Sequence, residues 1–289
     1  MPTPAAPDRM DTLPPSVSRE LELAFPVSDE EVAAFREQGF VHLRQVFSRE
    51  LIEFFRPKIT QAVEKDLPNP APLEERDSYG KSFLQVPNLW TRHSEVRPLS
   101  LSRRCAGIAS ALLETRGVRM WHDQALFKEA GGGRTAWHCD QFFWPLSSDR
   151  SISAWIPLQD TPVEFGAVQF AGGSHRHDHG RHLGITDEGE EQVATSIREH
   201  GLAVHREDFA LGDVSFHSGW TFHRAEPNAS GQMRGVMTVI YIDQAMRVAE
   251  PANPFQKYDQ DTWAPGCQVG DPIASEINPI LYSVDDSSV

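Results

Sequence analysis

Short β-rich runs recur along the chain between about residues 118 and 245, and this pattern constrains the fold most strongly. Clusters of Gly, Pro, Asn and Asp separate the runs, as an all-β sandwich or barrel requires. The runs cover residues 118–129, 136–144, 151–159, 166–171, 212–217 and 234–243, with one helical insert over 187–201. We therefore predict a mainly β protein with flanking helices and a double-sheeted β core, a jelly roll.

Helix signals precede this region. Ser28 followed three residues later by Glu31 is a capping box, and Gly39 is placed to end the helix that it starts. Residues 40–47 then predict a strand, and Ser48 is a second N-cap. Further predicted segments are a helix over 48–65, a loop over 66–80 and a helix over 101–117 closed by Gly117.

The length of 289 residues suits one large domain, and no internal repeat divides it. The opening "MPTPAAPDRMDTLPPS" is rich in proline and small residues and has no apolar stretch, so we expect a flexible leader over 1–24 and no secretory signal. A single domain is expected over 25–289. Its expected parts are a helical N-terminal part over about 25–117, the jelly-roll core over about 118–245 and a C-terminal extension over 246–289.

Composition limits the partners. A formal net charge of −14 argues against binding nucleic acid or an anionic membrane, and no apolar run is long enough to span a bilayer. The three cysteines are far apart in the sequence, which predicts a reducing, cytoplasmic compartment. A small-molecule substrate is the expected partner, and the oligomeric state stays open.

The stretch "TAWHCDQFFWP" contains a candidate pair of metal ligands, His138 and Asp140. Residues i and i+2 of a strand point to the same face, so the imidazole and the carboxylate are expected side by side with Cys139 facing away. Two ligands from one strand make an incomplete site, and a third must come from elsewhere.

The third candidate is His223, which precedes a turn rich in Asn, Ser and Gly, and Arg234 begins the strand that follows. A hairpin centred between Asn228 and Ala229 would place His223 opposite Arg234, about 5 Å apart at Cβ. The planar guanidinium suits the far carboxylate of a metal-chelating ligand. His217 also ends a strand and is the rival ligand, but Gly219 interrupts the strand after it. Two histidines and one carboxylate form the facial triad of non-haem Fe(II) oxygenases.

This combination resembles the phytanoyl-CoA dioxygenase family of Fe(II)/2-oxoglutarate oxygenases. The resemblance rests on H-x-D, a histidine about 80 residues later, N-x-S, and an arginine eleven residues after that histidine, supported by "EEVAAFREQGFVHLRQVFS", "LFKEAGGGRTAWHCD" and "FAGGSHR". It implies a double-stranded β-helix that uses Fe(II), 2-oxoglutarate and O2. It further implies that 2-oxoglutarate is decarboxylated to succinate and CO2 while a C–H bond of the substrate is oxidised.

Carried over residue by residue, the resemblance makes His138, Asp140 and His223 the iron ligands and Arg234 the partner of the C5 carboxylate of 2-oxoglutarate. Trp155 stands where the family often has a tryptophan beside the cosubstrate. The serine that often follows the distal histidine by two residues is Ala225 here. Related halogenases have a small residue in place of Asp140, so the carboxylate implies hydroxylation.

Other residues are weaker candidates. Gln124 and Lys128 share a strand face and could reach the cosubstrate. His122 has the same parity, so it is either a pocket residue or a packed core residue. Phe142, Phe143 and Trp144 fit a substrate wall or a core equally well. The tract His175, His177, His179 and His182 reads as solvated surface more than as a metal site.

Three functions stay open. The first is hydroxylation of an unactivated C–H bond of a small metabolite, and the second is cyclisation, desaturation or epimerisation with the same cofactors. The third is a cupin-like metal-binding protein without oxygenase activity, which would not need Arg234. A coenzyme A thioester would need a local basic pocket, for which Arg103, Arg104, Arg134 and Arg150 are the candidates.

Overall fold

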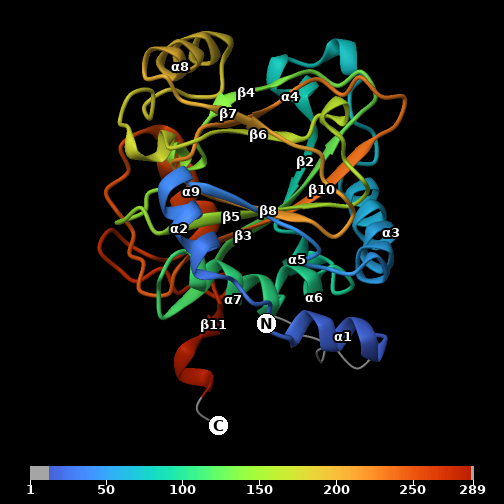
Figure 1. The fold of residues 1–289 in the computed structure, drawn as a ribbon, viewed down its shortest axis with the longest axis vertical. Coiled ribbons are helices and arrows are strands. Elements are labelled where there is room, and N and C mark those ends of the chain that lie inside the picture. Colours follow the sequence, from blue (N-terminus) through green and yellow to red (C-terminus); the bar gives the residue numbers. More distant parts are fainter. Residues whose placement is uncertain (1–12, 288–289) are drawn as a thin grey trace.

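Two antiparallel β-sheets face each other in this computed structural model, which describes residues 13–287 (Figure 1). The larger sheet contains, in spatial order, β1 (Phe40–Leu43), β8 (Val214–Ser218), β5 (Ser151–Pro157), β10 (Arg234–Asp243), β3 (Gly117–Lys128) and β11 (Ile280–Ser283), and β2 (Leu84–Pro87) also pairs with β3. The smaller sheet contains, in order, β4 (Thr135–His138), β9 (His223–Ala225), β6 (Val168–Ala171) and β7 (Val204–Arg206). The predicted jelly roll with flanking helices is confirmed.

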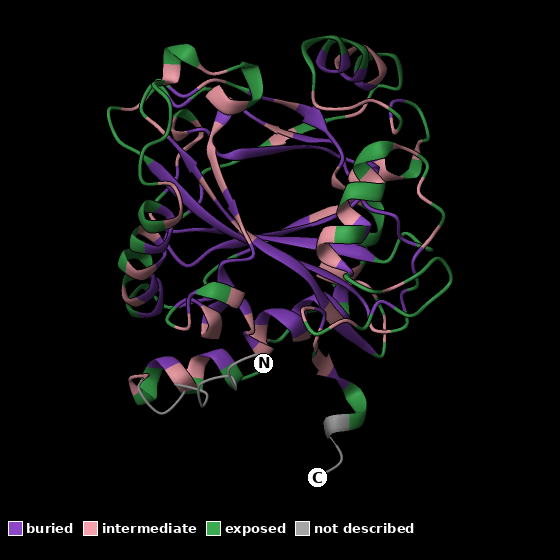
Figure 2. Cartoon of the chain, turned by 180° about the vertical axis from the view of Figure 1, so that it is seen from behind, coloured by how far each residue is buried: buried purple, intermediate pink, exposed green. Residues whose placement is uncertain are grey.

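Helices cover the outer side of the larger sheet, while its inner side faces the smaller sheet (Figures 1 and 2). The α-helices are α1 (Pro15–Glu22), α2 (Asp29–Gln38), α3 (Arg49–Asp66), α4 (Ser78–Ser82), α5 (Leu89–Arg92), α6 (Arg97–Ser100), α7 (Arg103–Leu112), α8 (Asp187–Glu199) and α9 (Pro254–Trp263). Short 3-10 helices cover Leu73–Glu75, Asp140–Phe143, Val163–Phe165, Ser174–Arg176 and Val284–Ser287. Among the described residues, no helix combines the length and apolarity needed to cross a bilayer.

Strand β10 shows how the larger sheet separates core from site. Met237, Val239 and Tyr241 point outward into the main hydrophobic core beneath the helices. Arg234 and Thr238 point the other way, into a cavity between the sheets. Both faces are therefore buried, which explains why apolar residues occupy both faces of the strand and do not alternate with polar ones.

The two helix starts predicted from capping residues, at Ser28 and Ser48, are confirmed. Ser28 and Glu31 form the reciprocal capping box of α2, with N···O distances of 2.7 and 3.2 Å. Gly39 ends that helix in the left-handed conformation, with a φ of 79°. Ser48 caps α3 by accepting from the Leu51 amide.

The predicted end of the third helix at Gly117 is wrong. Helix α7 ends at Leu112, and Glu114 takes the left-handed conformation (φ 50°) that glycine was expected to supply. Gly117 instead begins β3, where a Cβ would lie 2.4 Å from the Tyr282 carbonyl oxygen of β11. The predicted strand over 40–47 is also shorter, and the predicted loop over 66–80 contains helical turns.

The prediction of a flexible leader over 1–24 is wrong for the second half of that segment. Residues 15–22 form α1, which buries Val17 and Leu21 against the main core. Residues 1–12 lie outside the described part of the chain. The expected C-terminal extension over 246–289 contributes α9, which closes the cavity, and β11, which extends the larger sheet.

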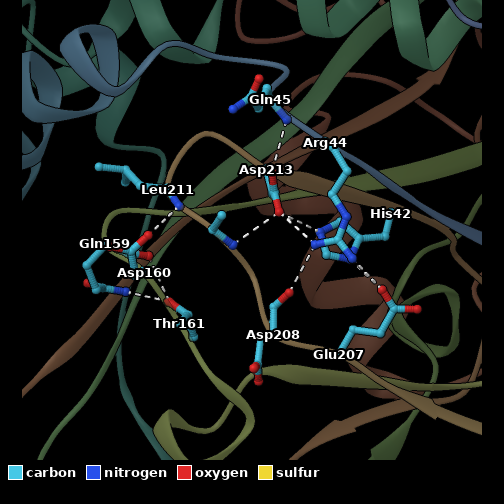
Figure 3. A network of polar contacts seen from close by, with 11 residues as sticks. His42, Arg44, Gln45, Gln159, Asp160, Thr161, Glu207, Asp208, Leu211 and Asp213 are labelled. Carbon is cyan, nitrogen blue, oxygen red and sulfur yellow. Dashed lines mark hydrogen bonds and ion pairs between the residues drawn. The ribbon is translucent and has the colours of Figure 1, made fainter.

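A polar network joins the N-terminal part to the jelly roll (Figure 3). Asp213, just before β8, accepts from the Gln45 amide at 2.9 Å and from Arg44 Nη1 at 2.9 Å. Burial opposes ionisation of Asp213, but these donors outweigh it and lower its pKa below the usual value. The network fixes the segment that leads into β8, whose inner face reaches the site.

Candidate active site

His138, Asp140 and His223 converge at the edge of the cavity. His138 and His223 are directly opposite each other in the pairing of β4 with β9. Their Nε2 atoms lie 3.7 and 3.6 Å from Asp140 Oδ1. Strand β4 ends at His138, and Asp140 begins a 3-10 turn instead of continuing the strand as predicted. The carboxylate nevertheless lies beside His138, and Cys139 packs away from it in a hydrophobic cluster.

The backbone orients both imidazoles. His138 Nδ1 lies 2.8 Å from the Ala136 carbonyl oxygen, and His223 Nδ1 lies 3.0 Å from that of Thr221. A carbonyl accepts only from a protonated nitrogen, so each ring carries its hydrogen on Nδ1 and presents the Nε2 lone pair to the cavity. Such a contact commonly orients a metal-binding histidine.

The protonation states suit metal binding. Burial lowers the pKa of His138 and of His223 to about 4, so both rings are neutral at pH 7. Burial alone would raise the pKa of Asp140, but the opposing charge interaction with His223 and a hydrogen bond from His217 lower it below the usual range. Two neutral nitrogens and one carboxylate oxygen on one side of a cavity form a donor set that fits Fe(II) with open positions.

His217, the rival ligand in the sequence, has another position. Its Nε2 lies 3.3 Å from Asp140 Oδ2, and Ser153 Oγ donates to the same oxygen at 2.8 Å. These contacts engage the carboxylate oxygen that faces away from His138 and His223. The arrangement holds Asp140 in place and leaves Oδ1 directed at the two ligand nitrogens.

The predicted hairpin between His223 and Arg234 is wrong. Strand β9 pairs with β4 and β6 in the smaller sheet, whereas β10 pairs with β3 and β5 in the larger one. The connection passes from sheet to sheet, and along it the Asn228 side chain donates to the carbonyls of Lys128, Glu129 and Gln232, at 3.2, 3.1 and 2.7 Å. His223 and Arg234 still line the same cavity, from opposite sheets.

Arg234 is a buried cation with no counter-ion in the part of the chain that the structure describes. It is 2% exposed, and Nη1 donates to the Gly166 carbonyl at 3.1 Å. Within residues 13–287 its Nε has no hydrogen-bond partner, and the guanidinium forms no ion pair. Burial lowers its pKa to about 9, so the group is still charged at pH 7. Because an unpaired buried charge is costly, the geometry fits a ligand that brings a carboxylate.

Of the other predicted cosubstrate residues, Trp155 and Lys128 lie beside Arg234, and Trp155 and Gln124 line the cavity whereas Lys128 does not. The Trp155 ring lies 5.5 Å from the Arg234 guanidinium carbon, a cation–π contact. Lys128 is opposite Arg234 in the pairing of β3 with β10 and is fully buried. Its ammonium donates to the Gly133 carbonyl and to Thr135 Oγ1, and Thr135 lines the cavity. Gln124 lines the cavity and accepts from Gln85 Nε2.

The cavity has a volume of about 680 Å³ and aromatic walls. Phe142, Phe143, Trp144 and His122 all line it. Phe142 and Trp144 also pack in hydrophobic clusters, so the wall and the core interpretations hold together. Further lining residues that the sequence did not single out are Tyr79 and Phe83 from α4 and the following residue, and Phe255, Tyr258, Asp259 and Trp263 from α9. Asn253 and Pro254 are a recognisable helix start that could have drawn attention to α9.

The remaining sequence candidates lie elsewhere. In the histidine tract, the rings of His177 and His179 lie 5.0 and 4.8 Å from that of His200, but among the described residues only His138, Asp140 and His223 have ligand atoms close enough for a three-residue metal site. The basic pocket considered for coenzyme A does not form. None of the four candidate arginines lines the cavity. They are Arg103, Arg104, Arg134 and Arg150.

Comparisons with solved structures find enzymes with a similar fold. The SnoK carbocyclase of nogalamycin biosynthesis, a non-haem α-ketoglutarate-dependent enzyme, is 27% identical over 88% of this chain and 96% of its own, with a TM-score of 0.71. The SnoN epimerase of the same biosynthesis (24% identity, 88% and 98% coverage, TM-score 0.70) shares the fold. So does EctD from S. alaskensis in complex with 2-oxoglutarate and 5-hydroxyectoine (20%, 78% and 79%, TM-score 0.63). The curated proteins contain no match to this sequence.

The amino-acid sequence also matches the model of a protein family. The phytanoyl-CoA dioxygenase model matches residues 35–236, which include all four residues His138, Asp140, His223 and Arg234. The chain therefore belongs to the phytanoyl-CoA dioxygenase family.

Proposed function

We propose that the protein is an Fe(II)/2-oxoglutarate-dependent dioxygenase that hydroxylates an unactivated C–H bond of a small organic molecule. The observation that carries this proposal is the position of the unpaired Arg234 guanidinium in the same cavity as His138, Asp140 and His223. A metal chelator with a free carboxylate satisfies both groups at once, and 2-oxoglutarate is such a molecule.

Each residue has a role in this proposal. His138, Asp140 and His223 hold the iron, with Asp140 kept in position by His217 and Ser153. Arg234 holds the far carboxylate of 2-oxoglutarate, and Trp155 packs over the guanidinium. The aromatic walls exclude water and orient the substrate. Bound Fe(II) would supply the activation of O2 and the oxidative decarboxylation of 2-oxoglutarate to succinate and CO2.

Ring closure or epimerisation with the same cofactors is the second candidate. It is favoured by the similarity to SnoK, a carbocyclase that is 27% identical over most of both chains. These outcomes, like desaturation, differ from hydroxylation in where the substrate lies relative to the iron. A cupin-like protein without oxygenase activity is a weaker alternative, since it would have no use for the buried Arg234.

The proposed compartment is the cytoplasm. All three cysteines are free thiols, and Cys105 and Cys139 are buried, which suits a reducing environment.

Succinate release tests the enzymatic proposal. Purified protein supplied with Fe(II), 2-oxoglutarate and O2 is expected to form succinate, and His223→Ala to abolish it by removing one ligand. His179→Ala is the matched control, because His179 is exposed and does not line the cavity. Equal succinate formation by the wild type and His223→Ala would contradict the proposal.

Product mass separates the two candidate outcomes once a substrate is found by stimulated succinate release. Hydroxylation adds one oxygen atom, cyclisation or desaturation removes two hydrogens, and epimerisation leaves the mass unchanged. A product without added oxygen would overturn hydroxylation and retain the iron and 2-oxoglutarate assignment.

A further inference from the structure

Helix α9 brings one acidic side chain into the aromatic part of the cavity. Asp259 lines the cavity together with Phe255, Tyr258 and Trp263 of the same helix. Tyr79 of α4 lies close enough to interact electrostatically with the Asp259 carboxylate. The site described above assigns no role to Asp259.

Helix capping and surface ion pairing are structural roles that an aspartate could have on α9, but other residues perform them. Asn253 caps the N-terminus of α9 by accepting from the Gln256 amide. Lys257 and Asp261 form the i,i+4 ion pair on the exposed side. Asp259 forms no ion pair among the described residues. Burial raises its pKa to about 7, opposed only by a hydrogen bond from the Trp263 side chain. A half-buried carboxyl without a cation is therefore directed into a ligand cavity.

Aromatic rings surround this carboxyl and continue to the rim of the cavity. Phe255 and Tyr258 are 54% and 65% exposed, which is high for large aromatic side chains on one helix. Phe255 also packs near Phe142 and Phe143, at ring-centroid distances of 6.0 and 5.6 Å. Aromatic faces next to a carboxylate form a suitable environment for a protonated amine.

The charges of the other lining residues favour a cationic ligand over an anionic one. Arg234 and Arg224 are the arginines that line the cavity. Arg224 is paired with Glu226 at 2.7 Å and lies 3.5 Å from Glu190, and Arg234 has its role in the proposed cosubstrate site. The net charge of −14 also attracts cations to the protein.

We propose that Asp259 and the aromatic residues around it bind a protonated amino group of the substrate, so that the substrate is an apolar or aromatic molecule with a basic amine. This inference rests on the proposed function, which makes the cavity a substrate site. The carboxylate determines specificity for the amine and takes no part in the oxidation. The exposed rings of Phe255 and Tyr258 cover the apolar body of the molecule.

Binding of a simple probe pair tests the inference without turnover. The probes are 4-phenylbutylamine and its neutral counterpart 4-phenylbutanol, titrated by ligand-observed NMR into full-length protein with Mn(II) and 2-oxoglutarate. The wild type is expected to bind the amine about tenfold tighter than the alcohol, and Asp259→Asn to remove that preference. Asp261→Asn is the matched control, since that carboxylate lies on the same helix and is exposed.

Several outcomes would overturn the inference. These are equal affinity for the two probes, tighter binding of the alcohol, no amine binding at millimolar concentration, or an unchanged preference in Asp259→Asn. Substrate-independent succinate release is measured in parallel. If the wild type releases no succinate but binds the amine through Asp259, the proposed function fails and the amine site stands. If the wild type and Asp259→Asn release succinate equally and the wild type does not prefer the amine over the alcohol, only the amine site fails.

Discussion

At the scale of the residue, the site is defined by buried charges that the protein itself does not neutralise. Arg234 and Lys128 lie on neighbouring strands, both buried and both without an ion-pair partner among the described residues. Retaining two such cations costs stability, and the cost is offset when a dicarboxylate binds between the sheets. We therefore expect that these two cations serve ligand binding more than folding.

If Lys128 contributes to the cosubstrate site, as proposed from the sequence, we expect cosubstrate binding to depend on pH. Burial, and then repulsion from Arg234, lower its pKa to about 7, while Glu226 acts in the opposite direction. A bound carboxylate raises this pKa again, so binding takes up a proton, and the affinity for 2-oxoglutarate falls as the pH rises through about 7. Calorimetry on the Mn(II)-loaded protein at pH 7.5, in two buffers of different ionisation enthalpy, is expected to show this uptake.

The matched variants for that measurement are Lys128→Met, which is expected to lose the proton uptake, and Lys65→Met, an exposed lysine on α3 that should keep it. A binding enthalpy that does not depend on the buffer in the wild type would contradict this role of Lys128.

At the scale of the element, helices that begin with a local capping motif could be predicted from the sequence. A helix stabilised by contacts with distant residues could not. The caps of α2 and α3 depend on residues three positions apart, so the sequence carries them in full. Helix α1 has Pro15 at its first position and no side-chain cap, and it is stabilised by Val17 and Leu21 packing under the other helices. That packing involves residues distant in the sequence, which composition does not reveal. The proline-rich composition therefore led to the prediction of a flexible leader.

Removing part of this packing measures what α1 contributes. Leu21→Ala is expected to lower the free energy of unfolding by about 2–5 kcal/mol in denaturant titration, because Leu21 is 1% exposed. Leu23→Ala, one residue past α1 and 47% exposed, should change it by less than about 0.5 kcal/mol. Equal, small effects of both substitutions would mean that α1 does not stabilise the domain.

At the scale of the whole molecule, the site depends on the two sheets facing each other. His138 and Asp140 could be read from the sequence because they are only two residues apart, and His223 was found through the resemblance to a known family. The direct pairing of β4 with β9, which brings these residues together, is visible only in the structure. The relation of His223 to Arg234 could not be read from the sequence, since spacing alone does not reveal that β9 and β10 belong to different sheets. Asp259 and Tyr79 reach the cavity from opposite ends of the chain, without any local motif to mark them.

The central claim is that both sheets contribute to one site, with the metal ligands on and beside the smaller sheet and the carboxylate-binding arginine on the larger one. Anaerobic addition of 2-oxoglutarate to the Fe(II)-loaded protein tests it most directly, because chelation produces a visible charge-transfer band. We predict that the band forms in the wild type, is absent in His223→Ala, and in Arg234→Gln requires much higher 2-oxoglutarate. A wild-type protein that binds Fe(II) but forms no band, or an Arg234→Gln variant with unchanged affinity, would contradict the account.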